Sequence, residues 1–189
     1  MDYRLIGNEK FTLNDEELDL SILDFWRWHF CDRFDLQDKM AEYIVAKALG
    51  LEEAYNIGEW TLFDILYRDK RIEVKETSYY HSWQSDEEPK SVRRSFGITK
   101  AHSEQQNPKS SFERQNDIYV FCLNTGNTKA DSDPLKLENW EFYIIPTSVI
   151  NEECGDAKSV SLSRIRKMTD KVGYTDIRKT IDSIINQSV

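Results

Sequence analysis

The pattern of hydrophobic and polar residues predicts a sheet with helices packed on it. Apolar residues recur at helical spacing in three segments, 14–33, 36–49 and 175–187. The first begins with an acidic turn, and Gly50 directly follows the second, as is typical of a helix end. Between the second and third, runs dense in aromatic and β-branched residues predict strands at 60–67, 71–77, 96–101, 117–123 and 141–145. We therefore expect an α/β protein.

The length and composition favour one domain. A chain of 189 residues of which 39% are hydrophobic can close one substantial core but is short for two. Nine Phe, nine Tyr and five Trp supply enough apolar area to exclude a wholly disordered chain. We therefore expect a single domain over residues 1–189, with the helices at 14–33 and 175–187 near its two ends.

Nothing in the sequence predicts contact with a membrane. No run approaches the ~20 apolar residues of a membrane helix, and the first residues lack the apolar core of a signal peptide. Cys31, Cys122 and Cys154 are odd in number and far apart, which fits neither a disulfide framework nor zinc-ligand spacing. We expect a cytoplasmic protein whose cysteines are reduced and structural.

The net charge of −9 argues against a protein that coats nucleic acid with a general basic surface. Residues 89–114 nevertheless contain six basic and two acidic residues, a local charge of +4. A solvated basic loop is one interpretation of this stretch. The other is contact with the phosphates of nucleic acid, for which the candidate residues are Arg93, Arg94, Lys100 and Arg114.

One predicted strand carries charge in an apolar setting. Glu73 and Lys75 alternate with Ile72 and Val74. Strand geometry therefore puts both charged groups on one face and both branched apolar groups on the other. Two further acidic residues lie two positions before a lysine, but both are in polar loop sequence. Only the pair in the strand combines this spacing with an apolar opposite face.

A second carboxylate comes from the preceding strand. With Asp69 and Lys70 at the tip of a hairpin, Asp64 opposes Lys75 and is a diagonal neighbour of Glu73 on the same face. Paired carboxylates can hold Mg²⁺ or Mn²⁺, which polarises a phosphodiester and acidifies bound water. Lys75 could then orient the water or stabilise charge on phosphorus. The alternative is an exposed hairpin with surface ion pairs.

Glu42 is a third candidate ligand. Its neighbours on the predicted helix are Val45, Ala46 and Leu49, so this carboxylate lies along an apolar stripe, where an uncompensated charge is costly. A metal site next to the stripe would offset this cost. Pairing with an arginine, or access to solvent at the edge of the stripe, would offset it as well.

The helix with its glutamate (MAEYIVAKALG), the strand with its aspartate (LFDILY) and the segment IEVK follow one another in an order that resembles the PD-(D/E)xK nuclease superfamily. The resemblance implies a restriction-endonuclease-like fold, a mixed β-sheet flanked by helices, with its core over about residues 36–150. Asp64 matches the aspartate of the motif, while Glu73 and Lys75 match its ExK half. Phe63 replaces the proline of the PD half.

Four longer segments, LDFWRWHF, AEYIVAKALG, IEVKETSYYHSWQ and WEFYIIPTSVIN, look like a family of uncharacterised bacterial proteins thought to adopt this fold. Gln84 falls where some nucleases of the superfamily place a polar residue near the catalytic lysine. His81 is a candidate phosphate donor or proton carrier, although a histidine between aromatic residues is more often packed or on the surface.

The expected function is Mg²⁺-dependent (or Mn²⁺-dependent) hydrolysis of phosphodiester bonds, in DNA rather than RNA. The candidate metal ligands are Glu42, Asp64 and Glu73, and the candidate catalytic residues are Asp64, Glu73 and Lys75. DNA is the expected partner, and the sequence leaves open whether the chain forms a homodimer. The competing hypotheses are an inactive nuclease-fold binding module in DNA processing or defence, and an acidic protein that mimics DNA.

Overall fold

The computed structural model describes residues 6–13, 16–29, 37–51, 63–80, 94–101, 112–128 and 131–187. The length of the chain predicted a single domain over 1–189. Contacts within the chain divide it into two compact units, Met1–Leu36 and Gln37–Val189, which we describe separately. Among the described residues, no helix is long and apolar enough to cross a membrane.

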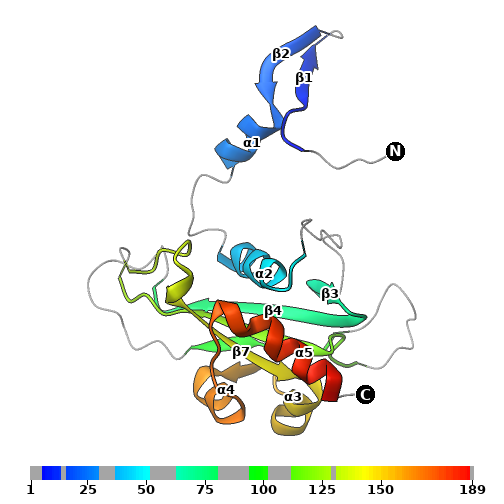
Figure 1. Cartoon of the computed structure of the whole chain (residues 1–189), viewed down its shortest axis with the longest axis vertical. Helices are drawn as coiled ribbons and strands as arrows, with labels where there is room; N and C mark the ends of the chain where they lie inside the picture. The colour runs from blue at the N-terminus through cyan, green and yellow to red at the C-terminus, as the bar shows by residue number, and fades with distance from the viewer. Residues whose placement is uncertain are drawn as a thin grey trace. The chain divides into compact units, whose positions relative to one another are not determined.

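The first unit is a β-hairpin followed by a short helix (Figure 1). Strand β1 (Lys10–Leu13) pairs antiparallel with β2 (Glu16–Ser21), and α1 covers Ile22–His29. The predicted helix at 14–33 is therefore wrong in its first part, where Glu16–Ser21 is a strand. Residues 30–33 lie outside the described residues.

The reason for this error lies at Ser21. Leu18 and Leu20 alternate with acidic residues in the period of a strand, and the helix starts only after Ser21. The Ser21 hydroxyl accepts a hydrogen bond from the Asp24 backbone N–H at 3.2 Å, and the Asp24 carboxylate accepts one from the Ser21 backbone N–H at 2.9 Å. This reciprocal pair is a capping box, which fixes the start of α1.

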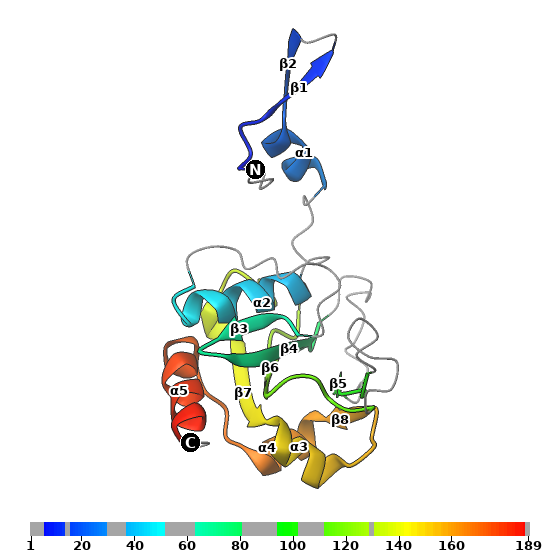
Figure 2. The ribbon, with the colours of Figure 1, turned by 90° about the vertical axis from the view of Figure 1, so that its right-hand side faces the viewer.

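The second unit is built on a mixed four-stranded sheet (Figures 1 and 2). The strand order is β3 (Ile65–Tyr67), β4 (Lys70–Ser78), β6 (Ile118–Asn124) and β7 (Trp140–Pro146). The pair β4–β6 is parallel, whereas β3–β4 and β6–β7 are antiparallel. A separate small sheet pairs β5 (Ser95–Gly97) antiparallel with β8 (Ser159–Ser161). The expected α/β class and mixed β-sheet flanked by helices are confirmed.

Each face of the sheet has its own core. On one face, α2 (Gln37–Ala48) and α5 (Ile177–Gln187) bury apolar residues together with Ile72, Val74 and Val120. On the other, α3 (Thr147–Cys154), α4 (Leu162–Met168) and the β5–β8 sheet pack over Tyr119 and Phe121. Figure 2 shows α2 above the sheet, with α3 and α4 below it. Short 3₁₀ helices, η1 (Leu137–Asn139) and η2 (Tyr174–Asp176), precede β7 and α5.

The end of α2 follows from one glycine, as predicted. Gly50 has φ +79°, a conformation that favours glycine. Its backbone N–H donates to the Lys47 carbonyl, and the Leu51 N–H donates to the Ala46 carbonyl, each at 3.0 Å. This is the Schellman arrangement, which satisfies the last carbonyls of the helix. The apolar stripe of α2 is thereby held over the sheet, with Ala41 and Val45 fully buried.

The predicted strands agree with the sheet, apart from their boundaries. The runs 71–77 and 141–145 are β4 and β7, each one residue longer at both ends, and 117–123 is β6 shifted by one residue. The run 60–67 contributes β3 only from Ile65, and 96–101 contributes β5 only to Gly97. The C-terminal helix predicted at 175–187 is α5. Cys122 and Cys154 are buried and free, as expected of structural cysteines.

Candidate metal site on the β3–β4 hairpin

A two-residue turn sets the register of the β3–β4 hairpin. Arg68 and Asp69 have φ of 49° and 61°, the positive values of a type I′ turn. Ile65 therefore pairs with Ile72 and Tyr67 with Lys70. The tip predicted at Asp69 and Lys70 is wrong by one position. The register derived from that tip is wrong by two positions.

Asp64 directly precedes β3, and the strand pairing ends at Ile65. Its N–H donates to the carbonyl of Ile72, the residue that pairs with Ile65, at 3.0 Å. Glu73 and Lys75 alternate with buried residues along β4 and therefore lie on one face of it. Ile72 and Val74 are buried on the opposite face.

Asp64 is fixed by the backbone of the neighbouring strand. Its Oδ2 accepts a hydrogen bond from the Val74 N–H at 2.7 Å. One carboxylate oxygen is therefore used by the fold, which orients the other relative to the strand. Asp64 also lines a pocket together with Glu73.

Glu73 is a buried carboxylate in an unfavourable electrostatic setting. Its side chain is 18% exposed and forms an ion pair with Lys75, which is 36% exposed. Burial raises the pKa of Glu73, and the negative charge of Asp64 raises it further, while Lys75 acts in the opposite direction. A further cation beside Glu73 would act, like Lys75, against both causes of the raised pKa. The site thus has the charge imbalance that a bound metal ion would correct.

Glu42 lies close enough to affect Glu73 but is bound elsewhere. Its charge contributes to the raised pKa of Glu73. Its own carboxylate oxygens accept hydrogen bonds from Lys39 Nζ at 2.9 and 3.1 Å, and its side chain is 26% exposed. The cost of a charge along the apolar stripe is therefore met by a lysine at the edge of that stripe. This partner is a lysine, whereas the sequence had suggested an arginine.

The pocket beside these carboxylates has a volume of about 210 Å³. Asp64 and Glu73 form one wall, and Tyr119 on β6 lies directly beside Glu73 in the parallel register. Burial, and next the charge of Glu73, raises the pKa of Tyr119 to about 12, so its hydroxyl stays protonated and can donate. The remaining lining residues are Thr99, Ala101, Arg114, Gln115 and Asn116.

Arg114 supports the pocket from within the fold. It is 6% exposed, and its guanidinium donates to the carbonyls of Ile98, Gly155 and Ala157 at 2.9 to 3.1 Å. It also donates to the Asn151 side chain at 2.6 Å. Arg114 was predicted to contact nucleic acid, but its nitrogens are engaged by the protein itself. We therefore leave it out of the proposed contact surface.

The other predicted basic contacts are only partly described. Arg94 donates to the Tyr79 carbonyl and lies over the Tyr79 ring at 5.7 Å. Lys100 pairs with Asp156 at 2.6 Å. Neither residue lines the pocket with Asp64 and Glu73. The remaining predicted residues, His81, Gln84 and Arg93, lie outside the described residues.

The residues that the sequence did not predict, Tyr119 and Asn116, line the pocket with the two carboxylates. Tyr119 belongs to a strand predicted correctly, but its place beside Glu73 depends on the parallel register of β4 and β6. Asn116 donates to the Ile118 carbonyl at 3.1 Å and to the Thr147 hydroxyl at 3.0 Å, which shapes the turn before β6. The only signal in the sequence was the polar run that precedes β6.

In the described ranges, no three carboxylate, imidazole or thiol side chains already form a group that could hold a metal ion. Asp64 and Glu73 supply two carboxylates, and Glu42 is turned to Lys39. Comparison of the chain with protein-family models gives no match, and comparison with curated proteins gives none either.

Proposed function

We propose that this protein is a metal-dependent nuclease with a restriction-endonuclease-like fold, which hydrolyses phosphodiester bonds in DNA in preference to RNA. The observation that supports it most is that Asp64 and Glu73 line the same pocket, with Lys75 paired to Glu73. Like charge and burial raise the pKa of Glu73, so the site favours a cation. The proposal includes the expected cytoplasmic location.

The donor set fits Mg²⁺ or Mn²⁺, because both ions prefer carboxylate oxygens. Asp64 and Glu73 would hold the ion, with Glu42 as a further ligand once it exchanges Lys39 for the ion. When bound, the ion would acidify a water molecule and offset negative charge on the phosphate.

The remaining chemistry belongs to residues of the chain. The Val74 N–H keeps the Asp64 carboxylate in place. The Lys75 ammonium, held by Glu73, can orient the attacking water and donate to a phosphate oxygen. The protonated Tyr119 hydroxyl belongs to the same pocket and can donate to a second phosphate oxygen.

The test is cleavage of linear, supercoiled and single-stranded DNA, and of RNA, in Mg²⁺ or Mn²⁺. We expect cleavage of DNA by the parent protein and a loss of about 10³-fold or more in the rate for Lys75→Ala. Chelation of the metal should abolish the reaction. Cleavage of no substrate by the parent protein, or equal cleavage by Lys75→Ala, would remove the assignment.

A second candidate is a nuclease-fold binding module without turnover, in DNA processing or defence. It is favoured by the pairing of Glu42 with Lys39 and by the ion pair between Glu73 and Lys75, which leave each carboxylate with a partner. Calorimetric titration with Mg²⁺ separates the two functions. Absence of metal binding, together with DNA binding that Glu73→Gln leaves unchanged, would select the module.

A further inference from the structure

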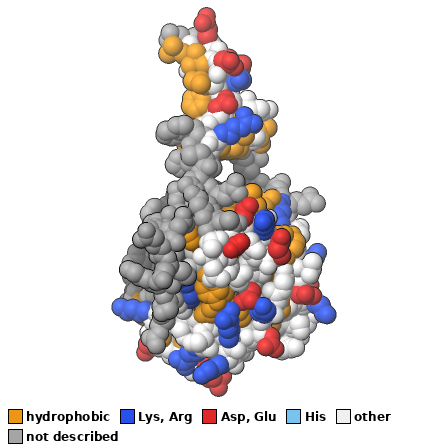
Figure 3. All heavy atoms as spheres, turned by 90° about the vertical axis from the view of Figure 1, so that its left-hand side faces the viewer, with side chains coloured by type: hydrophobic (Ala, Val, Ile, Leu, Met, Phe, Trp, Pro, Cys, Tyr) orange, Lys and Arg blue, Asp and Glu red, His pale blue; other side chains and the backbone are white. Residues whose placement is uncertain are grey.

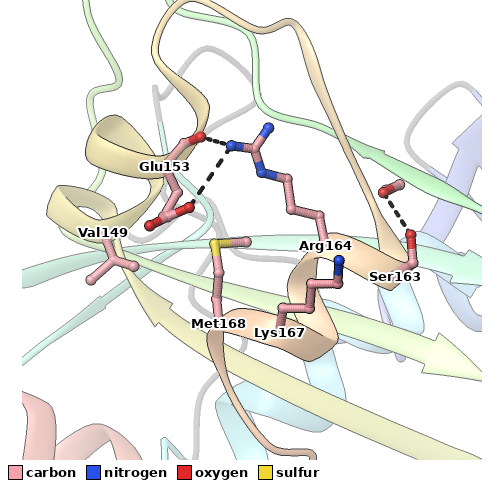
Figure 4. A pocket seen from close by; sticks show the side chains of 7 residues that line it. Val149, Glu153, Ser163, Arg164, Lys167 and Met168 are labelled. Atoms are coloured by element: carbon pink, nitrogen blue, oxygen red, sulfur yellow. Dashed lines mark hydrogen bonds and ion pairs between the residues drawn. The ribbon is translucent and has the colours of Figure 1, made fainter.

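A second pocket lies between α3 and α4, apart from the carboxylates of the β3–β4 hairpin (Figure 4). Its volume is about 610 Å³. We call it the α4 pocket. The lining residues that bear on its chemistry are Glu153, Ser161, Ser163, Arg164, Lys167 and Met168.

The α4 pocket gathers hydrogen-bond donors and positive charge. Arg164 donates to the Glu153 carbonyl and lies 3.8 Å from its carboxylate. The hydroxyl groups of Ser161 and Ser163 are 3.1 Å apart, so one donates to the other and the pair keeps a proton to donate elsewhere. Lys167 lies on the same side of α4 as Arg164 (Figure 4), and its lining of the pocket adds a second cation.

The balance of charge in this pocket is positive. Two cations face one carboxylate, which leaves a surplus of one positive charge. The surplus continues along the chain, since residues 158–171 contain five basic residues and one acidic residue, a local charge of +4 in a chain of net charge −9. Of these five, Arg166 and Lys171 are bound to Glu141, so Arg164 and Lys167 are the cations that the pocket presents. Figure 3 shows basic side chains at the lower end of one face.

The α4 pocket and the hairpin pocket are linked by one short segment. Ser161 of the α4 pocket pairs with Ser95 of β5, and Thr99, four residues after Ser95, lines the pocket with Asp64 and Glu73. A fully extended segment rises at most ~3.6 Å per residue, so Ser95 and Thr99 are at most about 14 Å apart. At about 3.4 Å per base pair, this distance corresponds to about four base pairs of duplex. The segment that links the two pockets is therefore short on the scale of a bound duplex.

We propose that the α4 pocket binds a backbone phosphate of the nucleic acid, a few nucleotides from the phosphodiester at the hairpin pocket. This inference rests on the proposed function, whose substrate it positions. Arg164 and Lys167 supply the charge that a phosphate needs, and the hydroxyl pair of Ser161 and Ser163 supplies a neutral donor. Glu153 holds Arg164 in place.

The experiment measures binding of a fluorescent 20-base-pair duplex by anisotropy between 50 and 200 mM NaCl, in a Glu73→Gln background that does not cut. Lys167→Gln should weaken binding about 5-fold and reduce the slope of log K against log salt by about 1, as expected for one lost phosphate contact. Arg164→Gln with Lys167→Gln should weaken it more. Lys167→Arg should restore the slope.

The matched control is Lys136→Gln, which removes the same charge from an exposed residue outside the α4 pocket. Equal effects of Lys167→Gln and Lys136→Gln would overturn the inference. Weaker binding of phosphatidylglycerol vesicles by Lys167→Gln, with DNA binding unchanged, would also overturn it. If Lys167→Gln loses DNA binding while the parent protein cuts nothing in Mg²⁺ or Mn²⁺, the phosphate-binding role of the α4 pocket is supported and the proposed nuclease activity is contradicted. If the parent protein cuts DNA but Lys167→Gln leaves DNA binding unchanged, the nuclease activity is supported and the role of the α4 pocket is contradicted.

Discussion

Two glutamates on the same face of the sheet have opposite surroundings. Glu73 on β4 is beside Asp64, and burial followed by that charge raises its pKa. Glu141 on β7 is similarly buried, but hydrogen bonds from Lys171, Tyr143 and Arg166 outweigh the burial and lower its pKa. The side chains are 18% and 16% exposed, so burial alone does not distinguish them.

The comparison separates a structural carboxylate from a candidate functional one. Glu141 receives hydrogen bonds at 2.5 to 2.9 Å from its three partners, so its charge is balanced within the fold. Glu73 has one cationic partner and faces a second carboxylate. Groups with perturbed pKa values are concentrated at functional sites. A site that keeps an unbalanced charge in the fold has capacity for an ion, whereas a balanced one does not.

The largest expected difference is in catalysis. Glu73→Gln removes a metal ligand and the partner of Lys75, and we expect it to slow DNA cleavage by about 10³-fold or more. Glu141→Gln makes the same chemical change at the balanced site and should stay within about 3-fold of the parent rate. Gel-based cleavage rates in Mg²⁺ provide the measurement. Equal losses of the cleavage rate in the two variants would show that both substitutions act through folding rather than through the chemistry of the site.

The next largest expected difference between the two glutamates is in stabilisation of the fold by metal. A ligand at about 100 times its Kd stabilises the folded state by about 2.7 kcal/mol. Mn²⁺ should therefore raise the Tm of the parent protein and of Glu141→Gln by several degrees. It should leave Glu73→Gln unchanged. A Tm rise in Glu73→Gln as large as in the parent would place the ion elsewhere.

The smallest expected difference is in stability without metal. The two substitutions should change the stability in opposite directions. At pH 7, Glu141→Gln leaves Arg166 and Lys171 without their common partner, and we expect it to cost about 1–3 kcal/mol. Glu73→Gln removes a buried charge that the fold disfavours, and should raise the Tm. Thermal melts in the presence of a chelator measure both.

The pH dependence follows from the same pKa directions. The pKa of Glu141 is below its ordinary value of 4.5, so its contribution is present above pH 4.5 and is lost as the pH falls through the folded pKa. The pKa of Glu73 is above 4.5, so its contribution is present below pH 4.5 and is lost as the pH rises through the folded pKa. The gain from Glu73→Gln should therefore disappear in acid. A gain that persists at pH 4 would contradict the raised pKa.

The sequence predicted the parts of this site that depend on local periodicity. Alternation of Glu73 and Lys75 with apolar residues placed both on one face, and Gly50 marked the end of α2. The register of the hairpin was predicted incorrectly because no glycine marks its turn, which Arg68 and Asp69 form with positive φ. The contacts of Arg114 and the position of Tyr119 depend on segments far apart in the chain, which periodicity does not report.

A crystal soaked in Mn²⁺ tests the central claim most directly, since anomalous scattering locates the ion. The account predicts a peak within about 2.5 Å of carboxylate oxygens of both Asp64 and Glu73. A peak elsewhere, with the hairpin carboxylates unliganded at saturating Mn²⁺, would contradict it.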